Sequence, residues 1–260
     1  MSALATAFAN ARNEDRALLV GYLPAGFAHP ETFKAMVDGG VDAVEVGLPY
    51  SDPLIDGPTI QEAVQRALAL GCGTRDVFDT VAAVAALGVP TVVMTYWNPV
   101  ERYGVERFAR DLAAAGGAGA ITPDLIPDEA GPWLAATHEH GLDPVFLVAP
   151  SSTEERLRVV TRVNGGFVYA ASTMGVTGTR DTVSSVAPDL VARVRAVTDL
   201  PVAVGLGVSN GAQAAEVASY ADGVVVGSAF VRAVLDAPGD PNDAVAALAT
   251  DLANGCRAKS

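Results

Sequence analysis

Cysteine, histidine and lysine are scarce in this chain of 260 residues. The two cysteines, Cys72 and Cys256, cannot build a disulfide framework, match no zinc-binding spacing and fit a reducing compartment. The three histidines are scattered and form no metal motif, so we predict no metal site. The only lysines are Lys34, in an early predicted helix, and Lys259, at the terminus, which disfavours Schiff-base and pyridoxal chemistry in this chain.

Basic residues and long apolar runs are also lacking. Lys and Arg number 17 against 30 Asp and Glu, and the net charge of −13 argues against nucleic acid and anionic membranes as partners. The longest apolar stretches cover about five to eight residues, whereas a membrane-spanning helix needs about 20. The N-terminal stretch lacks the basic start and apolar run of a targeting signal. We therefore expect a soluble, cytoplasmic protein.

What the chain does contain is a series of short apolar runs, rich in β-branched residues and bounded by Gly or Pro. Such runs are typical of buried parallel strands. We predict eight strands, at 17–22, 43–47, 91–96, 119–122, 145–149, 167–171, 201–205 and 223–227. The amphipathic stretches between them predict helices, among them 31–39, 59–70, 105–115, 153–163 and 211–220.

This alternation predicts an α/β fold with one domain over residues 1–260. A doubly wound open sheet uses the same alternation, but eight units in about 230 residues fit a (β/α)8 TIM barrel better. In such barrels the loops after the strands build the active site. Long stretches containing Gly or Pro follow the second and sixth predicted strands, at 47–58 and 172–187.

Glu45 is an acid inside an apolar strand. Side chains alternate along a strand, so Val44 and Val46 share one face and Glu45 takes the other, which in a barrel is the interior. Burial there raises the pKa of a carboxyl group toward neutrality, as a proton-transferring residue requires. The alternative is a structural glutamate paired with a buried cation, but the only Lys or Arg near the C-terminal end of a predicted strand is Arg180, in a loop.

The loop after this strand holds two further acids among three prolines. Asp56 could return over the same barrel mouth, eleven residues after Glu45. Asp52 could form an Asx-turn or bind a partner. Spacing alone leaves both assignments open, because loop aspartates are usually turn formers.

Glycines mark the ends of the seventh and eighth strands. Gly205 and Gly207 precede a helix expected to start at Ser209, and Gly227 precedes one expected to start at Ser228. Backbone amides and helix N-termini at these positions of a barrel commonly bind phosphate. Two ordinary strand-to-helix turns are the alternative. A net charge of −13 means that an anionic ligand must be captured locally.

The segment 172–180 contains two glycines and small polar residues, which suits a lid that excludes water. Disorder without function is the other interpretation. Tyr169, near the end of the sixth strand, could direct its hydroxyl to the barrel mouth or be an ordinary core tyrosine.

The chain resembles the α subunits of tryptophan synthase from about Leu19 to Leu235. The first of the matching segments is the most specific: VEVGLPYSDPLIDGPTIQ at 44–61, MTYWNP at 94–99, STMGVTGTR at 172–180, VGLGVS at 204–209 and DGVVVGSA at 222–229. The resemblance implies a (β/α)8 TIM barrel of the phosphate-binding type. It would cleave indole-3-glycerol phosphate to indole and glyceraldehyde 3-phosphate, a carbon–carbon lyase step of tryptophan biosynthesis.

The resemblance also implies roles for individual residues. Glu45 would be the acid/base group that protonates the indole ring, and Asp56 would hold the ring N–H and stabilise positive charge. Substrate-binding residues would be Tyr169, Thr177, Gly178, Gly205, Gly207, Gly227 and Ser228. Thr177 would also close the lid and orient Asp56. No cofactor is implied in this chain.

The expected partner is the β subunit, in an α2β2 heterotetramer, which carries pyridoxal phosphate and consumes the indole. Pro49, Asp52 and Asn98 match the family's surface for it. The sequence departs from the usual family pattern at Thr173, Leu206 and Pro24, although none of these removes a proposed catalytic group.

Two other functions compete with this lyase. One is an indole-glycerol-phosphate synthase, whose ring closure usually relies on a catalytic lysine that is missing here at any predicted strand end. The other is a barrel kept mainly to activate a β subunit, which the departures at Thr173 and Leu206 motivate.

Overall fold

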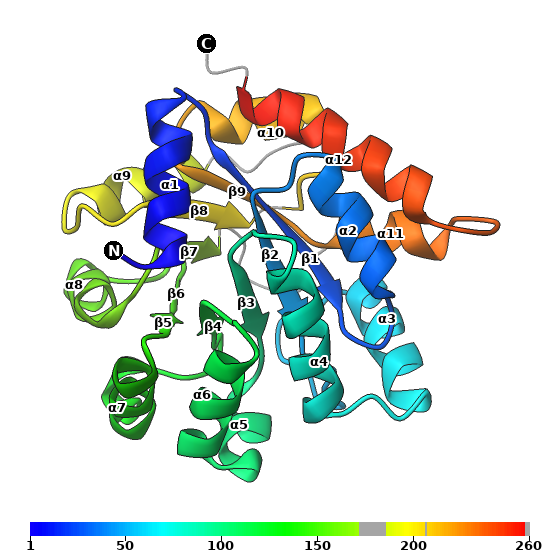
Figure 1. Cartoon of the computed structure of the whole chain (residues 1–260). Coiled ribbons are helices and arrows are strands. Elements are labelled where there is room, and N and C mark those ends of the chain that lie inside the picture. The colour runs from blue at the N-terminus through cyan, green and yellow to red at the C-terminus, as the bar shows by residue number, and fades with distance from the viewer. Residues whose placement is uncertain (172–185, 206, 258–260) are drawn as a thin grey trace.

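A computed structural model describes residues 1–171, 186–205 and 207–257 of the chain. Its strands form a nine-stranded parallel sheet in the order β5-β4-β3-β2-β1-β9-β8-β7-β6 (Figure 1). The strands are β1 (Leu18–Pro24), β2 (Ala43–Gly47), β3 (Thr91–Met94), β4 (Gly119–Ile121), β5 (Asp143–Val145), β6 (Leu147–Val148), β7 (Val168–Ala171), β8 (Val202–Gly205) and β9 (Gly223–Val226).

The sheet closes into a barrel at Phe146. Strands β5 and β6 stand at the two ends of the sheet order, yet only this residue separates them in the chain. The backbone N–H of Phe146 donates to Asn164 Oδ1 (2.8 Å), and Asn164 Nδ2 donates to the Phe167 carbonyl (2.9 Å). The side chain of Asn164 thus replaces strand pairing at the seam. The predicted (β/α)8 barrel is confirmed, with the fifth predicted strand found as two pieces.

Helices surround the barrel (Figure 1). They are α1 (Ala3–Asn13), α2 (Pro30–Asp38), α3 (Pro58–Ala69), α4 (Thr74–Ala85), α5 (Trp97–Tyr103), α6 (Val105–Ala114), α7 (Gly131–His140), α8 (Glu154–Val163), α9 (Ala187–Arg195), α10 (Gly211–Ala218), α11 (Ser228–Leu235) and α12 (Asn242–Arg257), with a 3-10 turn at Pro127–Glu129. All five helices given as examples from the sequence are present, within about two residues at each end. That residues 1–260 form one domain stays a prediction.

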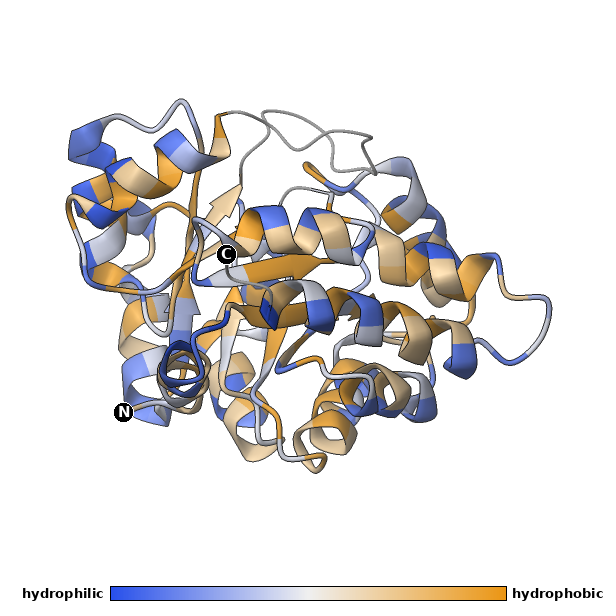
Figure 2. Ribbon diagram, turned by 90° about the horizontal axis from the view of Figure 1, so that it is seen from above, coloured by the Kyte–Doolittle hydropathy of each residue, from blue (hydrophilic) through white to orange (hydrophobic). Residues whose placement is uncertain are grey.

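Two apolar clusters stabilise the barrel. The larger one lies between the strands and the outer helices, and the smaller one fills the barrel interior with side chains such as Val20, Val92 and Phe167. Helix α1 adds Leu4 and Phe8 to the inner cluster and so covers the end where the strands begin. In Figure 2 the central strands are mainly hydrophobic, whereas the surrounding helices mix hydrophobic and hydrophilic residues.

Capping contacts fix the starts of two helices and correct one expected start. Thr153 caps α8 by accepting a hydrogen bond from the Arg156 N–H, while the Ser152 hydroxyl instead accepts from the Ala149 N–H. Asn210 caps α10, so this helix begins at Gly211 and not at Ser209. Helix α11 begins at Ser228 as predicted.

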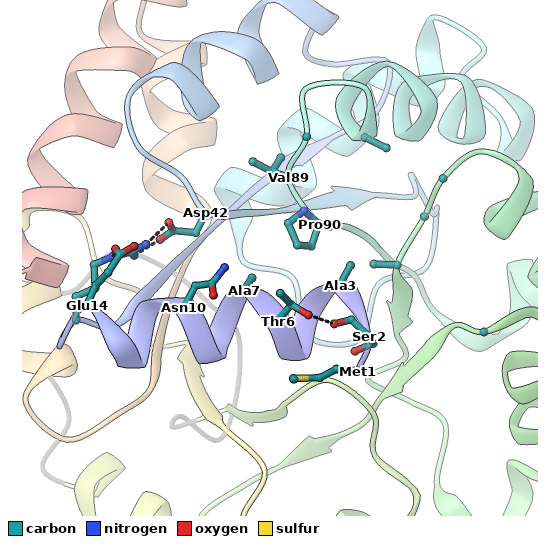
Figure 3. A pocket seen from close by; sticks show the side chains of 17 residues that line it. Met1, Ser2, Ala3, Thr6, Ala7, Asn10, Glu14, Asp42, Val89 and Pro90 are labelled. Carbon is teal, nitrogen blue, oxygen red and sulfur yellow. Dashed lines mark hydrogen bonds and ion pairs between the residues drawn. The ribbon is translucent and has the colours of Figure 1, made fainter.

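A wide hollow of about 740 Å³ lies beside α1, at the N-terminal end of the strands (Figure 3). One side of it consists of small residues in the turns before β3, β4 and β5. The charged side chains at its edge are already paired, because Arg16 contacts both Asp42 (2.7 Å) and Glu14 (2.6 Å). Such pairing contributes to stability at this face of a barrel, whereas chemistry belongs at the opposite face.

Candidate active site

A second cavity, of about 340 Å³, opens at the C-terminal ends of the strands. It collects side chains from several strand ends and the loops that follow them: Tyr22, Glu45, Ile55, Asp56, Ile60, Met94, Pro123, Leu147, Val148, Ala149, Ser152, Tyr169, Ala171, Gly205, Gly207, Val225, Gly227 and Ser228. None of these described lining residues is a Lys or Arg. The cavity therefore combines an apolar wall with two acids and no matching cation from the described part of the chain.

Glu45 lies where the alternation along β2 predicts, in the wall of this cavity. Only 2% of its surface is exposed, and its Oε1 has no hydrogen-bond partner among the described residues. Burial raises the pKa of Glu45 from 4.5 to about 8. The carboxyl group therefore holds its proton at neutral pH and can deliver it to a ligand in the cavity.

Asp56 reaches the same cavity from the loop after β2. Burial raises its pKa, while a hydrogen bond with the Tyr96 hydroxyl acts in the opposite direction. The Tyr96 hydroxyl also accepts a hydrogen bond from the Ile55 N–H (3.1 Å), which fixes the loop beside the acid. Thus Glu45 and Asp56 share one cavity, but of the two only Asp56 has a neighbour in the described part of the chain that favours its ionised form.

The rings of two tyrosines pack against glycines at the ends of neighbouring strands. A Cβ atom at Gly205 would lie 2.5 Å from the Tyr169 hydroxyl, and a Cβ at Gly47 would lie 2.4 Å from the Tyr22 hydroxyl. Each ring therefore occupies space that any larger residue on the neighbouring strand would take. Burial raises the pKa of both phenols well above the usual value, and the nearby acids raise it further. Both hydroxyl groups stay protonated at neutral pH.

Gly205, Gly207, Gly227 and Ser228 also line the cavity, at the ends of β8 and β9. Gly207 has a positive φ of 73°, which glycine adopts without strain. Helix α11 starts at Ser228, so its N-terminus is at the cavity wall. This arrangement offers backbone amides and a helix dipole to an anion. The predicted ligand residues Thr177 and Gly178, like Thr173 and Leu206, lie outside the described residues.

The residues predicted to meet a partner protein differ in exposure. Asp52 and Asn98 are exposed, on the loop after β2 and on α5, whereas Pro49 is buried. Leu54, in the same loop as Asp52, is 70% exposed although it is a large apolar residue. The Asp124 carboxylate accepts hydrogen bonds from the Trp97 N–H at 2.9 and 3.1 Å, which anchors the start of α5.

Sequence reasoning missed Tyr22 and Tyr96 as parts of the site. Tyr22 stood in a predicted strand, and the period-two alternation that singled out Glu45 also turns it inward. Tyr96 gave no comparable signal, because its role depends on a hydrogen bond to a loop about forty residues earlier in the chain. In the described part of the chain, Glu106, Glu139 and His140 could together reach a metal ion, but Glu106 and Glu139 are exposed and none of the three lines this cavity.

Comparisons with known proteins agree with this geometry. Residues 8–258 match the family model described as tryptophan synthase alpha chain. The chain belongs to this family. It is 62% identical to the tryptophan synthase alpha chain of Nocardia farcinica, over 98% of this chain and 96% of that one. It is 59% identical to that of Acidothermus cellulolyticus, over 99% and 98% of the two chains.

A solved structure of tryptophan synthase from Mycobacterium tuberculosis superposes with a TM-score of 0.93, at 56% identity and 98% coverage of both chains. As an α chain of tryptophan synthase, the protein is a lyase that cleaves indole-3-glycerol phosphate in tryptophan biosynthesis. This outcome excludes the ring-closing synthase considered from the sequence. Among the described residues, no helix has the length and apolar character of a membrane span.

Proposed function

We propose that Glu45 and Asp56 carry out the cleavage of indole-3-glycerol phosphate in this α chain. Protonated Glu45 donates its proton to the indole carbon that bears the side chain. Asp56 binds the ring N–H and stabilises the positive charge that develops on the ring. The Glu45 carboxylate then accepts the proton of the adjacent side-chain hydroxyl. That oxygen becomes the aldehyde carbonyl, the carbon–carbon bond breaks, and its electrons restore the aromatic indole.

The phosphate of the substrate is proposed to lie at the ends of β8 and β9. Gly205, Gly207, Gly227 and Ser228 supply main-chain N–H groups there, and α11 directs its N-terminus to the same place. Tyr169 lies beside the substrate, and Thr177 and Gly178 are expected to contribute from the lid. A phosphate fixed at these strand ends places the ring near Glu45 and Asp56.

The observation that carries this proposal is a buried, unpaired acid in the cavity wall, with its pKa raised to about 8. Since Glu45 must be protonated to act first as an acid, kcat/KM is expected to fall as the pH rises through about 8. Steady-state rates of indole release, measured from about two pH units below this value to two above it, test the expectation.

The direct test is Glu45→Gln, which preserves shape but cannot donate a carboxyl proton. It should abolish indole release while still binding an indole phosphate that lacks side-chain hydroxyl groups, as measured by calorimetry. Glu155→Gln, on the exposed surface of α8, is the matched control and should keep wild-type activity. Full activity of Glu45→Gln would exclude the assignment.

We further propose that this chain needs no cofactor of its own and works with a tryptophan synthase β subunit in an α2β2 assembly. Pyridoxal phosphate would then belong to the β subunit. Exposed Asp52, Leu54 and Asn98 support a contact surface near the cavity, to which buried Pro49 would contribute through the shape of its loop. The cysteines Cys72 and Cys256 are both unpaired, which supports a cytoplasmic location.

Mixing the chain with a β subunit and following co-elution and indole release tests the assembly. Asp52→Lys should weaken co-elution, whereas Asp189→Lys on α9 is a charge-matched control away from this surface. Indole release in the α chain alone or in the complex supports a lyase. Partner activation without indole release in either condition would instead support a barrel kept as an activator.

A further inference from the structure

Tyr22 is the register neighbour of Glu45. The two residues are Cα partners on the parallel strands β1 and β2, and both line the cavity. Partners on adjacent strands lie about 5 Å apart and direct their side chains to the same face. Tyr22 therefore stands beside the proposed acid/base group, on an element as rigid as the one that carries Glu45.

The ring of Tyr22 packs against a glycine at each end, so no side chain separates it from the backbone of the neighbouring strands. At its base, a Cβ on Gly227 would lie 3.3 Å from the ring, and at its tip a Cβ on Gly47 would lie 2.4 Å from the hydroxyl. Gly47 follows Glu45 by two residues, so the two positions lie on the same face of β2. The ring thus leans toward the end of β2, and its hydroxyl lies beside Gly47, two residues beyond Glu45 on that strand.

Proton transfer creates an electrostatic problem at Glu45. Once its proton moves to the substrate, a carboxylate remains at a position that is 2% exposed, and Oε1 has no partner among the described residues. A buried carboxylate without a donor is costly, so it must gain a hydrogen bond during turnover. The titratable groups that face it from the neighbouring elements are Tyr22, Tyr169 and Asp56, with Tyr96 behind Asp56.

Among these groups, Tyr22 is the one whose Cα pairs with that of Glu45 across adjacent strands, although Glu45 is the acid that acts more strongly on Tyr169, and Asp56 the one that acts more strongly on Tyr22. Tyr96 is engaged with Asp56 and Ile55, and Tyr169 rises from β7, on the other side of the barrel interior. Asp56 carries the same charge as the carboxylate that forms. We propose that Tyr22 is a positioning residue whose hydroxyl donates a hydrogen bond to the Glu45 carboxylate formed during cleavage. No proton leaves the phenol, and Glu45 recovers its own proton from the substrate hydroxyl.

This inference rests on the proposed role of Glu45, and Tyr22→Phe tests it. The variant keeps the aromatic ring packed against Gly47 and Gly227 and removes only the hydroxyl group, so the full chain should fold as before. With indole-3-glycerol phosphate, in the complex with a β subunit, kcat should fall about tenfold while KM changes less than about twofold. The alkaline limb of kcat/KM should move upward by about one pH unit, because the ionised form of Glu45 loses its donor.

Three companion variants separate this role from packing. Tyr220→Phe removes a buried hydroxyl that has no partner among the described residues and lies away from the cavity, so its pH profile should match the wild type. Gly47→Ala pushes the Tyr22 hydroxyl aside and should shift the alkaline limb as Tyr22→Phe does. Combining the two changes should add no further shift. If Tyr169→Phe moves the limb and Tyr22→Phe does not, Tyr169 is the donor and the inference is wrong.

A wild-type kcat and an unmoved alkaline limb of kcat/KM in Tyr22→Phe would also overturn the inference that Tyr22 is the donor. The assignment of Glu45 itself is judged separately. An inactive Glu45→Gln with an unaffected Tyr22→Phe refutes only the role of Tyr22, whereas an active Glu45→Gln refutes the catalytic proposal first.

Discussion

Replacing Glu45 by Gln should remove activity and, at the same time, remove a pH-dependent loss of stability. The pKa of Glu45 is 4.5 in the unfolded reference and about 8 in the folded chain. Between these values the folded state holds a proton that the unfolded state has released, so stability falls as the pH rises. Each pH unit in this window costs about 1.4 kcal/mol, which gives about 3 kcal/mol at neutral pH. The amide of the Glu45→Gln variant cannot ionise, so the variant escapes this cost.

The assay is urea unfolding of the wild type and Glu45→Gln at a series of pH values between the two pKa values. The free energy of unfolding of the wild type minus that of the variant should decrease by about 1.4 kcal/mol per pH unit. Other buried acids, such as Asp56 and Asp143, are common to both proteins and cancel in this difference. Glu155→Gln, at an exposed position, is the control for the Glu-to-Gln change itself. Parallel stability curves for wild type and Glu45→Gln would refute the claim that Glu45 is buried as a neutral acid.

Three further substitutions probe the supports of the site. Gly205→Ala should lower kcat/KM at least about tenfold, because its Cβ would lie 2.5 Å from the Tyr169 hydroxyl and displace that ring; steady-state assays measure it. Tyr96→Phe should raise the pKa of Asp56, which loses the hydrogen bond that lowers it, and so move the acidic limb of kcat/KM upward in a pH-rate series. Asn164→Ala should destabilise the chain by about 2 kcal/mol in urea unfolding, since two backbone groups at the barrel seam lose their partner.

The barrel and its principal acid could be predicted because they depend on local pattern. Strand periodicity alone turns Glu45 toward the interior, since Val44 and Val46 must pack against helices. The glycines after β8 and β9 were predictable for a similar reason, because a barrel brings consecutive strand ends to one rim. In each case the sequence carries the information within a few residues of the feature.

The remaining features depend on neighbours that sequence does not reveal. Strand β5 begins with Asp143 and Pro144, two residue types depleted in strands, and it forms there because β4 supplies a partner. The break at Phe146 depends on Asn164, eighteen residues later. The hydrogen bond from Tyr96 to Asp56 likewise joins two separate strand-end loops. Such contacts follow from tertiary packing and leave no periodic signal.

The two ends of the barrel treat charge in opposite ways, and this difference identifies the site better than size does. At the N-terminal end, Arg16 is held between Asp42 and Glu14, so the wider hollow beside it is bordered by charges that are already satisfied. At the other end, the fold buries Glu45 without a cation among the described residues and accepts a loss of stability at neutral pH. A group that weakens the folded state in this way is best explained by what it does with a ligand, because an apolar residue of similar size would pack there at lower cost.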